Sequence, residues 1–204
     1  MTITTLPVGV FETNCYLVKR GSALYVVDPG AEPERIRLAA EQLGFERVEI
    51  LLTHAHFDHI GAVEALAELW NIDQVSLGAE DTRIYQSARN AYPPYYPVSE
   101  KLPPAREYAD NPDFRVLALP GHTPGGRGLL FTDGEHQHLL VGDTVFAGSI
   151  GRTDLPGGDY SALINSIRTE IETLPDEVAL YPGHGEATTV GAERRHNPYF
   201  TRKG

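Results

Sequence analysis

The stretch LLTHAHFDHIGAV, residues 51–63, places three histidines and an aspartate within six positions, directly after an apolar run. Residues two apart on an extended segment face the same way, so His54 and His56 can reach one metal ion together. Asp58 and His59 follow once the chain turns into an expected helix, and they can reach a neighbouring point. Imidazole and carboxylate donors suit zinc, iron or manganese, and the number of nitrogen donors favours zinc. The stretch therefore predicts a metal centre where a strand meets a helix.

Three later segments repeat this arrangement of an apolar strand, a glycine turn and a potential ligand. They place His122 in LALPGHTPGG, Asp143 in LLVGDTVF and His184 in VALYPGHGEA. Ligands on loops at one edge of a sheet scaffold converge well, so we expect these side chains to join the first four. His136 and His138 in DGEHQHLL lack the acid and the glycine turn, and they are predicted to be surface residues.

The pattern of apolar residues and turns predicts one α/β domain over residues 1–204. Residues 91–108 are rich in proline and tyrosine, which predicts irregular structure. Strands are expected at 2–10, 13–20, 23–30, 47–54, 74–81, 114–122, 126–134, 137–146 and 178–185. Helices are expected at 32–44, 58–70, 80–90 and 159–174.

Composition excludes several classes of function. The formal net charge is −11, and the one local cluster of basic residues lies at 193–204, whereas nucleic-acid-binding proteins usually carry a basic stripe. The N-terminus shows no export signal, and no segment approaches the ~18 apolar residues of a membrane helix. A single cysteine, Cys15, rules out a disulfide framework within one chain and is expected to be buried in a strand. The sequence predicts a cytoplasmic protein with no nucleic-acid or membrane partner.

Seven potential ligands are too many for one tetrahedral site. Two sites that share one carboxylate fit better, and each then keeps an open position, which is typical of a catalytic rather than a structural site. A shared carboxylate and hydroxide hold two metals about 3.5–4 Å apart, and metal ligation lowers the pKa of bound water from about 15.7 to near 7. The cluster therefore predicts a hydroxide nucleophile at neutral pH. Asp28 in VVDPG is expected to hydrogen-bond behind the ligands rather than to bind metal.

The motifs HAHFDH, GHTPG, GDTVF and PGHG, in this order over nearly the whole chain, resemble those of the metallo-β-lactamase superfamily. The resemblance implies an αββα four-layer sandwich with two divalent metal ions at one edge of its sheets. Zinc is the first choice of metal, with iron or manganese as alternatives. The resemblance also implies the ligand sets: His54, His56 and His122 for one ion, Asp58, His59 and His184 for the other, and Asp143 as the bridge.

Within this superfamily, the segments FAGSIGRTDLPGGD and PGHGEATTVGAERRHNPY are similar to glyoxalase II, the hydroxyacylglutathione hydrolases, and to their short bacterial branch. This similarity implies hydrolysis of S-D-lactoylglutathione, a small-molecule thioester, to D-lactate and glutathione. It also implies that Asp58 is catalytic, because it would both ligate a metal and orient the hydroxide.

The sequence departs from the glyoxalase II pattern in the region that binds glutathione. Full-length members have a further helical C-terminal region, and this chain stops soon after HNPYF. Arg152 and Asp154 stand where the family has a lysine and a tyrosine. Arg152 can still bind a substrate carboxylate, and Tyr92 and Tyr95 of the proline-rich segment are expected to line the substrate pocket or to pack over the core.

Other activities on the same fold stay open. A persulfide dioxygenase would hold one iron through His54, His122 and Asp143 and act on glutathione persulfide. A lactonase or another metallo-hydrolase would use the same ligands. A β-lactamase is disfavoured because the export signal is absent and Asp143 stands where many lactamases have cysteine.

Overall fold

The computed structural model describes residues 1–201. The chain forms two compact units, Met1–Tyr108 and Ala109–Gly204. Residues 202–204, which end the basic cluster noted in the sequence, lie outside the described residues. Each unit has its own sheet, helices and apolar core, and each is described by itself below. The expectation of a single domain stays a prediction.

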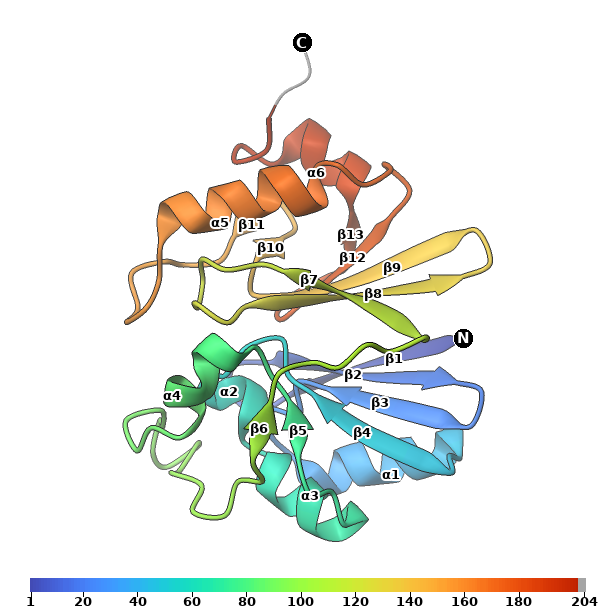
Figure 1. Ribbon diagram of the computed structural model, residues 1–204, viewed down its shortest axis with the longest axis vertical. Helices are drawn as coiled ribbons and strands as arrows, with labels where there is room; N and C mark the ends of the chain where they lie inside the picture. Colours follow the sequence, from blue (N-terminus) through green and yellow to red (C-terminus); the bar gives the residue numbers. More distant parts are fainter. Residues whose placement is uncertain (202–204) are drawn as a thin grey trace. The chain divides into compact units, whose positions relative to one another are not determined.

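The first unit contains a six-stranded sheet with the strand order β1-β2-β3-β4-β5-β6 (Figure 1). The strands are β1 (Thr2–Val8), β2 (Thr13–Arg20), β3 (Ala23–Val27), β4 (Arg47–Leu51), β5 (Val75–Ser76) and β6 (Ala105–Arg106). The strands β1, β2 and β3 are antiparallel, and the pairs from β3 to β6 are parallel. Val27 pairs with Leu51, so β3 and β4 end at the same edge of the sheet. The segments that follow these two strands, 28–30 and 52–56, therefore leave the sheet side by side.

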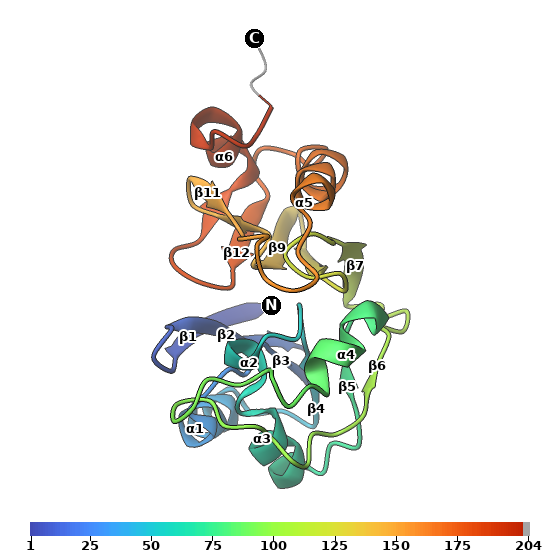
Figure 2. The ribbon, with the colours of Figure 1, turned by 90° about the vertical axis from the view of Figure 1, so that its left-hand side faces the viewer.

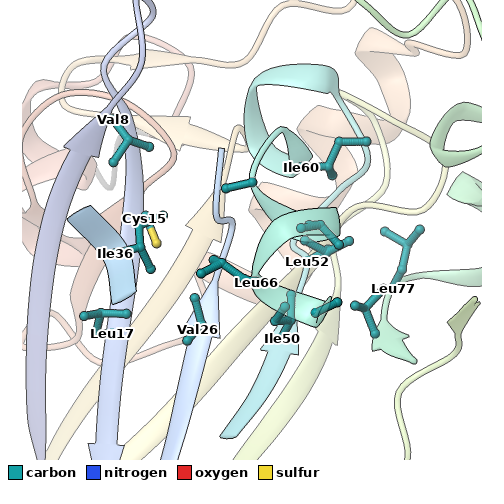
Figure 3. Packing of buried hydrophobic residues seen from close by; sticks show 14 of the residues in the cluster. Val8, Cys15, Leu17, Val26, Ile36, Ile50, Leu52, Ile60, Leu66 and Leu77 are labelled. Atoms are coloured by element: carbon teal, nitrogen blue, oxygen red, sulfur yellow. The ribbon is translucent and has the colours of Figure 1, made fainter. Parts of the chain in front are cut away.

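The helices of the first unit are α1 (Pro33–Leu43), α2 (Phe57–Ile60), α3 (Val63–Trp70) and α4 (Thr82–Tyr85). Figure 1 shows α1 and α3 on the same face of the sheet. Ile36 of α1 and Leu66 of α3 pack there against alternating residues of the strands, including Leu17 and Val26 (Figure 3). Burial of these apolar side chains stabilises the unit by about 25 cal/mol for each Å² removed from water.

The prediction of one continuous helix over 58–70 is wrong, because the chain forms two short helices there, α2 and α3, with a break between them. The Ala62 N–H donates to the carbonyl of Pro29 (2.9 Å) instead of continuing the helical pattern. A Cβ at Gly61 would overlap the carbonyl oxygen of Gly30, so the chain can approach this closely only through glycine. The break therefore ties α2, the helix that carries Asp58, to the turn after β3. The helix expected over 80–90 is also shorter, since only α4 and a 3₁₀ turn at Ala79–Asp81 form.

The second unit contains a five-stranded sheet with the order β13-β12-β9-β8-β7 and a separate hairpin. The strands are β7 (Phe114–Ala118), β8 (Arg127–Asp133), β9 (His136–Gly142), β12 (Ala179–Pro182) and β13 (Thr188–Thr189), and the hairpin is β10 (Val145–Phe146) with β11 (Ser149–Ile150). The strands β7, β8 and β9 form an antiparallel meander, and β12 pairs parallel to β9. Asp133 pairs with His136 at the end of this ladder, so the chain turns tightly between β8 and β9.

The helices of the second unit, α5 (Tyr160–Ser166) and α6 (Val190–His196), lie on the same side of its sheet (Figure 2). A π-helical segment, Ile167–Ile171, continues α5, so the expected helix over 159–174 is largely confirmed. Leu163, Ile167 and Ile171 from this helix pack with Leu139 and Leu180 of the sheet. Among residues 1–201, no helix is long and apolar enough to cross a membrane.

Candidate metal centre

The segment after β4 brings four expected ligands together within the first unit. His54 and His59 are buried, whereas His56 and Asp58 are partly exposed. The ring of His54 lies 4.9 Å from that of His56 and 4.1 Å from that of His59, measured between centroids. Imidazoles this close are unfavourable as core material and favourable as a set of metal donors.

A buried carboxylate behind the ligands fixes the state of two of these histidines. Asp28 Oδ1 accepts from the backbone N–H of Thr53 (2.7 Å), and Asp28 Oδ2 accepts from Thr53 Oγ1 (2.6 Å) and from His59 Nδ1 (3.0 Å). The one proton of the Thr53 hydroxyl is thus directed at Asp28, so His54 Nδ1–H donates to Thr53 Oγ1 (3.1 Å). With both Nδ1 atoms protonated, Nε2 is the nitrogen that His54 and His59 could each offer to a metal.

Asp28 also lies within 4.8 Å of donor atoms of His54 and His59, so the three residues could themselves form a metal site. The hydrogen bonds argue for the other role, because both oxygens of Asp28 already accept from Thr53 and His59. Asp28 is fully buried at the start of the turn after β3, with a left-handed backbone (φ 51°). This geometry supports the sequence prediction that Asp28 orients the ligands and does not bind metal.

Asp58 projects from the first turn of α2 toward its neighbours in the cluster. Its Oδ2 lies 3.8 Å from His59 Nε2 and accepts a hydrogen bond from Thr13 Oγ1 (3.2 Å). Gly30 packs against the backbone of Asp58 so closely that a Cβ at Gly30 would overlap the Asp58 carbonyl oxygen. The DPG turn after β3 therefore sets the position of the helix that carries Asp58.

The peptide between His54 and His56 is held by two side chains that sequence reasoning missed. The backbone N–H of Ala55 donates to the buried carboxylate of Asp81 (3.2 Å), and the carbonyl of Ala55 accepts from Asn90 Nδ2 (2.7 Å). The sequence gives little sign of this role, because Asp81 stands near the start and Asn90 at the end of the polar helix expected over 80–90. Both contacts restrain the backbone that carries the two histidines.

The second unit assembles the other three expected ligands around one carboxylate. Asp143 Oδ2 lies 3.5 Å from His122 Nε2 and 3.6 Å from His184 Nε2. His122 Nδ1–H donates to the carbonyl of Arg152 (2.7 Å), which makes Nε2 its metal-binding nitrogen. One carboxylate oxygen therefore faces two imidazole nitrogens, an arrangement suited to binding metal.

In this unit too, a glycine packs closely against the backbone of an expected ligand, Asp143. A Cβ at Gly151 would overlap the carbonyl oxygen of Asp143 and would contact His122. Gly151 N–H donates to the carbonyl of Thr144 (3.2 Å), which closes the β10–β11 hairpin next to the ligands. The two units thus position an aspartate ligand by the same device, a glycine packed on its carbonyl.

Arg152 does not present an isolated positive charge. Its guanidinium makes two parallel hydrogen bonds to the carboxylate of Asp154, at 2.7 and 2.8 Å. The hydrogen bonds from Arg152 lower the pKa of Asp154 to about 2, so the carboxylate is ionised at neutral pH. Both side chains are exposed, so the pair lies in water beside the His122 segment. A substrate carboxylate would have to compete with Asp154 for Arg152.

The tyrosines of the proline-rich segment divide into two environments. Tyr92 and Tyr95 are 48% and 60% exposed, whereas Tyr96 is buried at 3%. A cavity of about 290 Å³ lies in the same unit, and its lining includes Phe57 and Asn90 but neither Tyr92 nor Tyr95. Tyr92 instead contacts the rings of Phe11 and Phe57.

The histidines expected outside the site are separate from these clusters. His136 is exposed, and His138 is half-buried in β9 with its Nδ1 3.1 Å from Tyr181 Oη. Burial lowers the pKa of His138, which favours its neutral form. Cys15 is buried in β2, as expected, and burial raises the pKa of its thiol.

The donor set in each unit fits a divalent transition metal. The first unit offers imidazole nitrogens with a carboxylate beside them, and the second offers two imidazoles on one carboxylate. Nitrogen and carboxylate oxygen donors of this kind suit zinc, iron and manganese. The donors sit on rigid turns with their orienting hydrogen bonds already made, which is the arrangement that metal ligands require.

Comparison with known proteins agrees with this chemistry. The sequence model of the metallo-β-lactamase superfamily matches residues 8–184. A hydroxyacylglutathione hydrolase of Haemophilus influenzae, GloC, is 36% identical over the full length of both chains.

Two solved structures are similar over nearly the whole chain. The BLEG-1 B3 metallo-β-lactamase has a TM-score of 0.86 and 32% identity, and the alignment covers 98% of this chain and 100% of that one. TTHA1623, solved in a di-iron-bound form, has a TM-score of 0.82 and 38% identity, with 97% and 100% covered. The expected fold class is therefore confirmed as the metallo-β-lactamase fold, a mixed α/β architecture built on two sheets.

Proposed function

Because the chain belongs to the metallo-β-lactamase superfamily, a family of metallo-hydrolases, we propose that it is a metal-dependent thioesterase. Its substrate is a small-molecule thioester, S-D-lactoylglutathione in the first instance, which it cleaves to D-lactate and glutathione. The full-length similarity to a hydroxyacylglutathione hydrolase supports this substrate class. The cytoplasmic location predicted from the sequence suits such a substrate and stays a prediction.

We assign two divalent ions to the seven ligands, with zinc as the first choice and iron or manganese as alternatives. One ion is held by His54, His56 and His122, the other by Asp58, His59 and His184, and Asp143 is shared. When bound, the ions supply an activated water at neutral pH and polarise the thioester carbonyl. This assignment rests on the family resemblance, and the nitrogen that each hydrogen bond leaves for the metal is consistent with it.

The observation that carries the proposal is the pair of distances at Asp143. Two histidines far apart in sequence place Nε2 at 3.5 and 3.6 Å from the same oxygen of one carboxylate. Two imidazoles and one carboxylate can hold a single ion or share a pair, and we infer a pair because seven donors exceed the four of one tetrahedral site. Paired ions with open positions favour hydrolysis of a carbonyl substrate over a structural role.

Side chains of this chain would orient the attacking water and the metal-binding histidines. Asp58 is the proposed catalytic residue, because its carboxylate would both ligate a metal and orient the attacking water, while Thr13 Oγ1 holds that carboxylate in place. Asp28 and Thr53 keep His54 and His59 in the tautomer that presents Nε2. Preorganised groups of this kind lower the barrier because little reorganisation is needed when the reaction occurs.

Substrate binding is assigned to Arg152, Tyr92 and Tyr95. Arg152 has the charge to hold a glutathione carboxylate, and its pairing with Asp154 weakens that contact. Tyr92 and Tyr95 offer exposed rings in the same unit as the first ligand cluster.

The test is to measure metal content and hydrolysis on one purified sample. We expect two metals per chain and loss of the thioester absorbance of S-D-lactoylglutathione, with turnover abolished in Asp58→Ala. One iron per chain, oxygen uptake on glutathione persulfide and no thioester cleavage would overturn the proposal in favour of the dioxygenase. Cleavage of lactones without cleavage of thioesters would move the activity to another class of hydrolase.

A further inference from the structure

Four aromatic side chains of the first unit form one continuous cluster that reaches the solvent. We call Phe11, Phe57, Tyr92 and Tyr95 the aromatic wall. Phe11, Tyr92 and Tyr95 are 41%, 48% and 60% exposed, and they are among the most exposed large hydrophobic residues in the described part of the chain. Scattered exposed apolar residues are ordinary, whereas exposed rings gathered in one place usually mark a binding surface.

The rings of the wall are ordered from the metal ligands outward. Phe57 is nearly parallel to Tyr92, with an interplanar angle of 13° and centroids 5.9 Å apart. Tyr92 is nearly parallel to Tyr95, with an angle of 18° and centroids 6.3 Å apart. Phe11 meets Phe57 and Tyr92 edge-on, at 5.7 and 5.3 Å. An offset ladder of this kind accepts a further flat ring by stacking or by an edge contact.

The wall is held in place by the backbone beneath it. Tyr92 and Tyr96 exchange two backbone hydrogen bonds, at 2.7 and 2.9 Å, which close the segment that carries Tyr95. The buried ring of Tyr96 packs on Phe11 and Phe57, with centroids 5.8 and 5.2 Å away. A Cβ at Gly9 would overlap Tyr96 Oη, so the turn that carries Phe11 also rests on this residue. A surface that is already ordered loses little entropy when a ligand binds.

The wall adjoins the metal ligands through the chain itself. Phe57 lies between His56 and Asp58 in the sequence and begins α2. A group that rests on Phe57 is therefore next to the residues proposed to act on the substrate. The segments that form the wall, 9–12, 57 and 91–96, contain Glu12 and neither lysine nor arginine. This surface suits an apolar group and not an anionic one.

We propose that the aromatic wall binds a flat apolar group of the substrate, so that the enzyme prefers thioesters with an aromatic acyl or thiol group to those with a small hydroxyacyl group. The proposal deepens the proposed function and rests on it. It also follows from the Arg152–Asp154 pair, because an enzyme with a weakened contact to carboxylates needs another source of substrate affinity.

The test compares kcat/KM for matched thioesters on the metal-loaded protein. In one arm the thiol is always glutathione, and the acyl group is mandeloyl or lactoyl. In the other arm the acyl group is always lactoyl, and the thiol is phenylmethanethiol or glutathione, two alkyl thiols that are similar as leaving groups. We expect the aromatic substrate to be favoured in one arm, which identifies the side of the substrate that carries the ring. No preference in either arm overturns the proposal.

Variants then locate the preference. Phe11→Ala and Tyr92→Ala should each lower the ratio of kcat/KM for the aromatic substrate over the matched non-aromatic one by about fivefold. A change of this size corresponds to the loss of one aromatic contact. Tyr160→Ala removes a tyrosine of the second unit with 55% exposure and should leave the ratio unchanged. Val98→Ala alters the lining of the 290 Å³ cavity at a residue that does not belong to the wall, and it should also leave the ratio unchanged. A lower ratio in Val98→Ala with none in Phe11→Ala would overturn the proposal, because the cavity would then hold the ring.

A binding measurement separates this proposal from the proposed function. Ligand-observed NMR compares phenylacetate with acetate on the metal-loaded protein, without any reaction. Binding of phenylacetate that is lost in Phe11→Ala supports the wall even if no thioester is cleaved, in which case the proposed function alone fails. Thioester cleavage with equal binding of the two acids refutes the wall and leaves the proposed function standing.

Discussion

Thr53 links His54, a proposed metal ligand, to the buried carboxylate of Asp28, and exchange of one heavy atom removes the hydroxyl that makes this link. In Thr53→Val, His54 Nδ1–H loses its acceptor, while the contact between His59 Nδ1 and Asp28 is retained. Loss of such an orienting partner typically lowers metal affinity about 10- to 100-fold. We expect that decrease in a chelator competition assay, together with about 1–3 kcal/mol less stability from the buried donor left unpaired.

Thr169→Val is the matched control for this change. Thr169 is an exposed residue whose Oγ1 donates to the carbonyl of Asn165 within its own helix, so it tests the loss of a hydroxyl away from the ligands. Metal affinity should stay at the wild-type value in this variant. Equal metal affinity in Thr53→Val and Thr169→Val would show that the relay through Thr53 does not orient His54.

If Arg152 binds the substrate as proposed, Asp154 competes with the substrate for its guanidinium. In Asp154→Asn the guanidinium loses its charged partner, so KM for S-D-lactoylglutathione should fall roughly two- to threefold, as expected for an exposed ion pair. The pKa of Asp154 is lowered to about 2, so the pair is intact above the ordinary aspartate pKa and is lost only as the pH falls through about 2. The gain should therefore be the same from pH 5 to pH 9. Steady-state kinetics across this range check it, and a KM that rises in Asp154→Asn would contradict the competition.

The proposed ligands could be named from the sequence because each one sits in a short, self-contained motif. His54, His56 and Asp58 lie within five residues of one another, directly after one strand. The short motif HAHFDH is therefore enough to indicate a set of metal donors. Asp81 and Asn90 could not be predicted in the same way. They contact Ala55 from 26 and 35 residues away, and nothing in their local sequence indicates that separation. Side chains that support a site from a distance become visible only in three dimensions.

At the scale of elements, glycines decide how closely α2 and the β10–β11 hairpin approach their neighbours. Gly30→Ala would place a methyl group on the carbonyl of Asp58, so α2 must move. Overpacking of this kind costs about 1–3 kcal/mol, and here it also displaces a metal ligand. We expect a lower Tm and weaker metal binding in this variant, measured by calorimetry and by chelator competition.

Gly21→Ala is the control at this scale. Gly21 has a left-handed backbone (φ 57°) with nothing within 4 Å of the added Cβ, so its substitution introduces backbone strain without a clash. It should lower stability by about 1 kcal/mol and leave metal affinity unchanged. If Gly30→Ala also kept full metal affinity, the position of α2 would not depend on the turn after β3.

Strands were more predictable than helices in this chain, for a physical reason. The strands β2 and β8 carry compact apolar runs bounded by turns, and the expected ranges agree closely with the observed ones. The helix expected over 58–70 has a regular apolar spacing throughout, yet it breaks because Ala62 N–H bonds to Pro29. That bond joins residues 33 positions apart and overrides local propensity. The break lies next to the proposed metal ligands, and the contacts that cause it also fix the position of Asp58.

At the scale of the whole molecule, the metal ions should determine how cooperatively the chain unfolds. The described chain divides into two compact units, each with its own sheet and apolar core. The proposed ligand set draws on residues of both units, so bound ions would couple their unfolding. We expect one calorimetric transition in the metal-loaded protein and two separate transitions after chelation.

The size of the effect follows from mass action. Metal at about 1,000 times its Kd stabilises the folded state by about 4 kcal/mol, which corresponds to a Tm increase of about 10 °C for a chain of this length. In Asp58→Ala one ligand of the proposed set is lost, so both the increase and the coupling should be smaller. If chelation left a single transition at an unchanged Tm, the ions would contribute nothing to folding and the ligand assignment would be wrong. If instead the metal-loaded protein unfolded in two transitions, each unit would bind its metal by itself, and the single domain predicted from the sequence would have to be replaced by two.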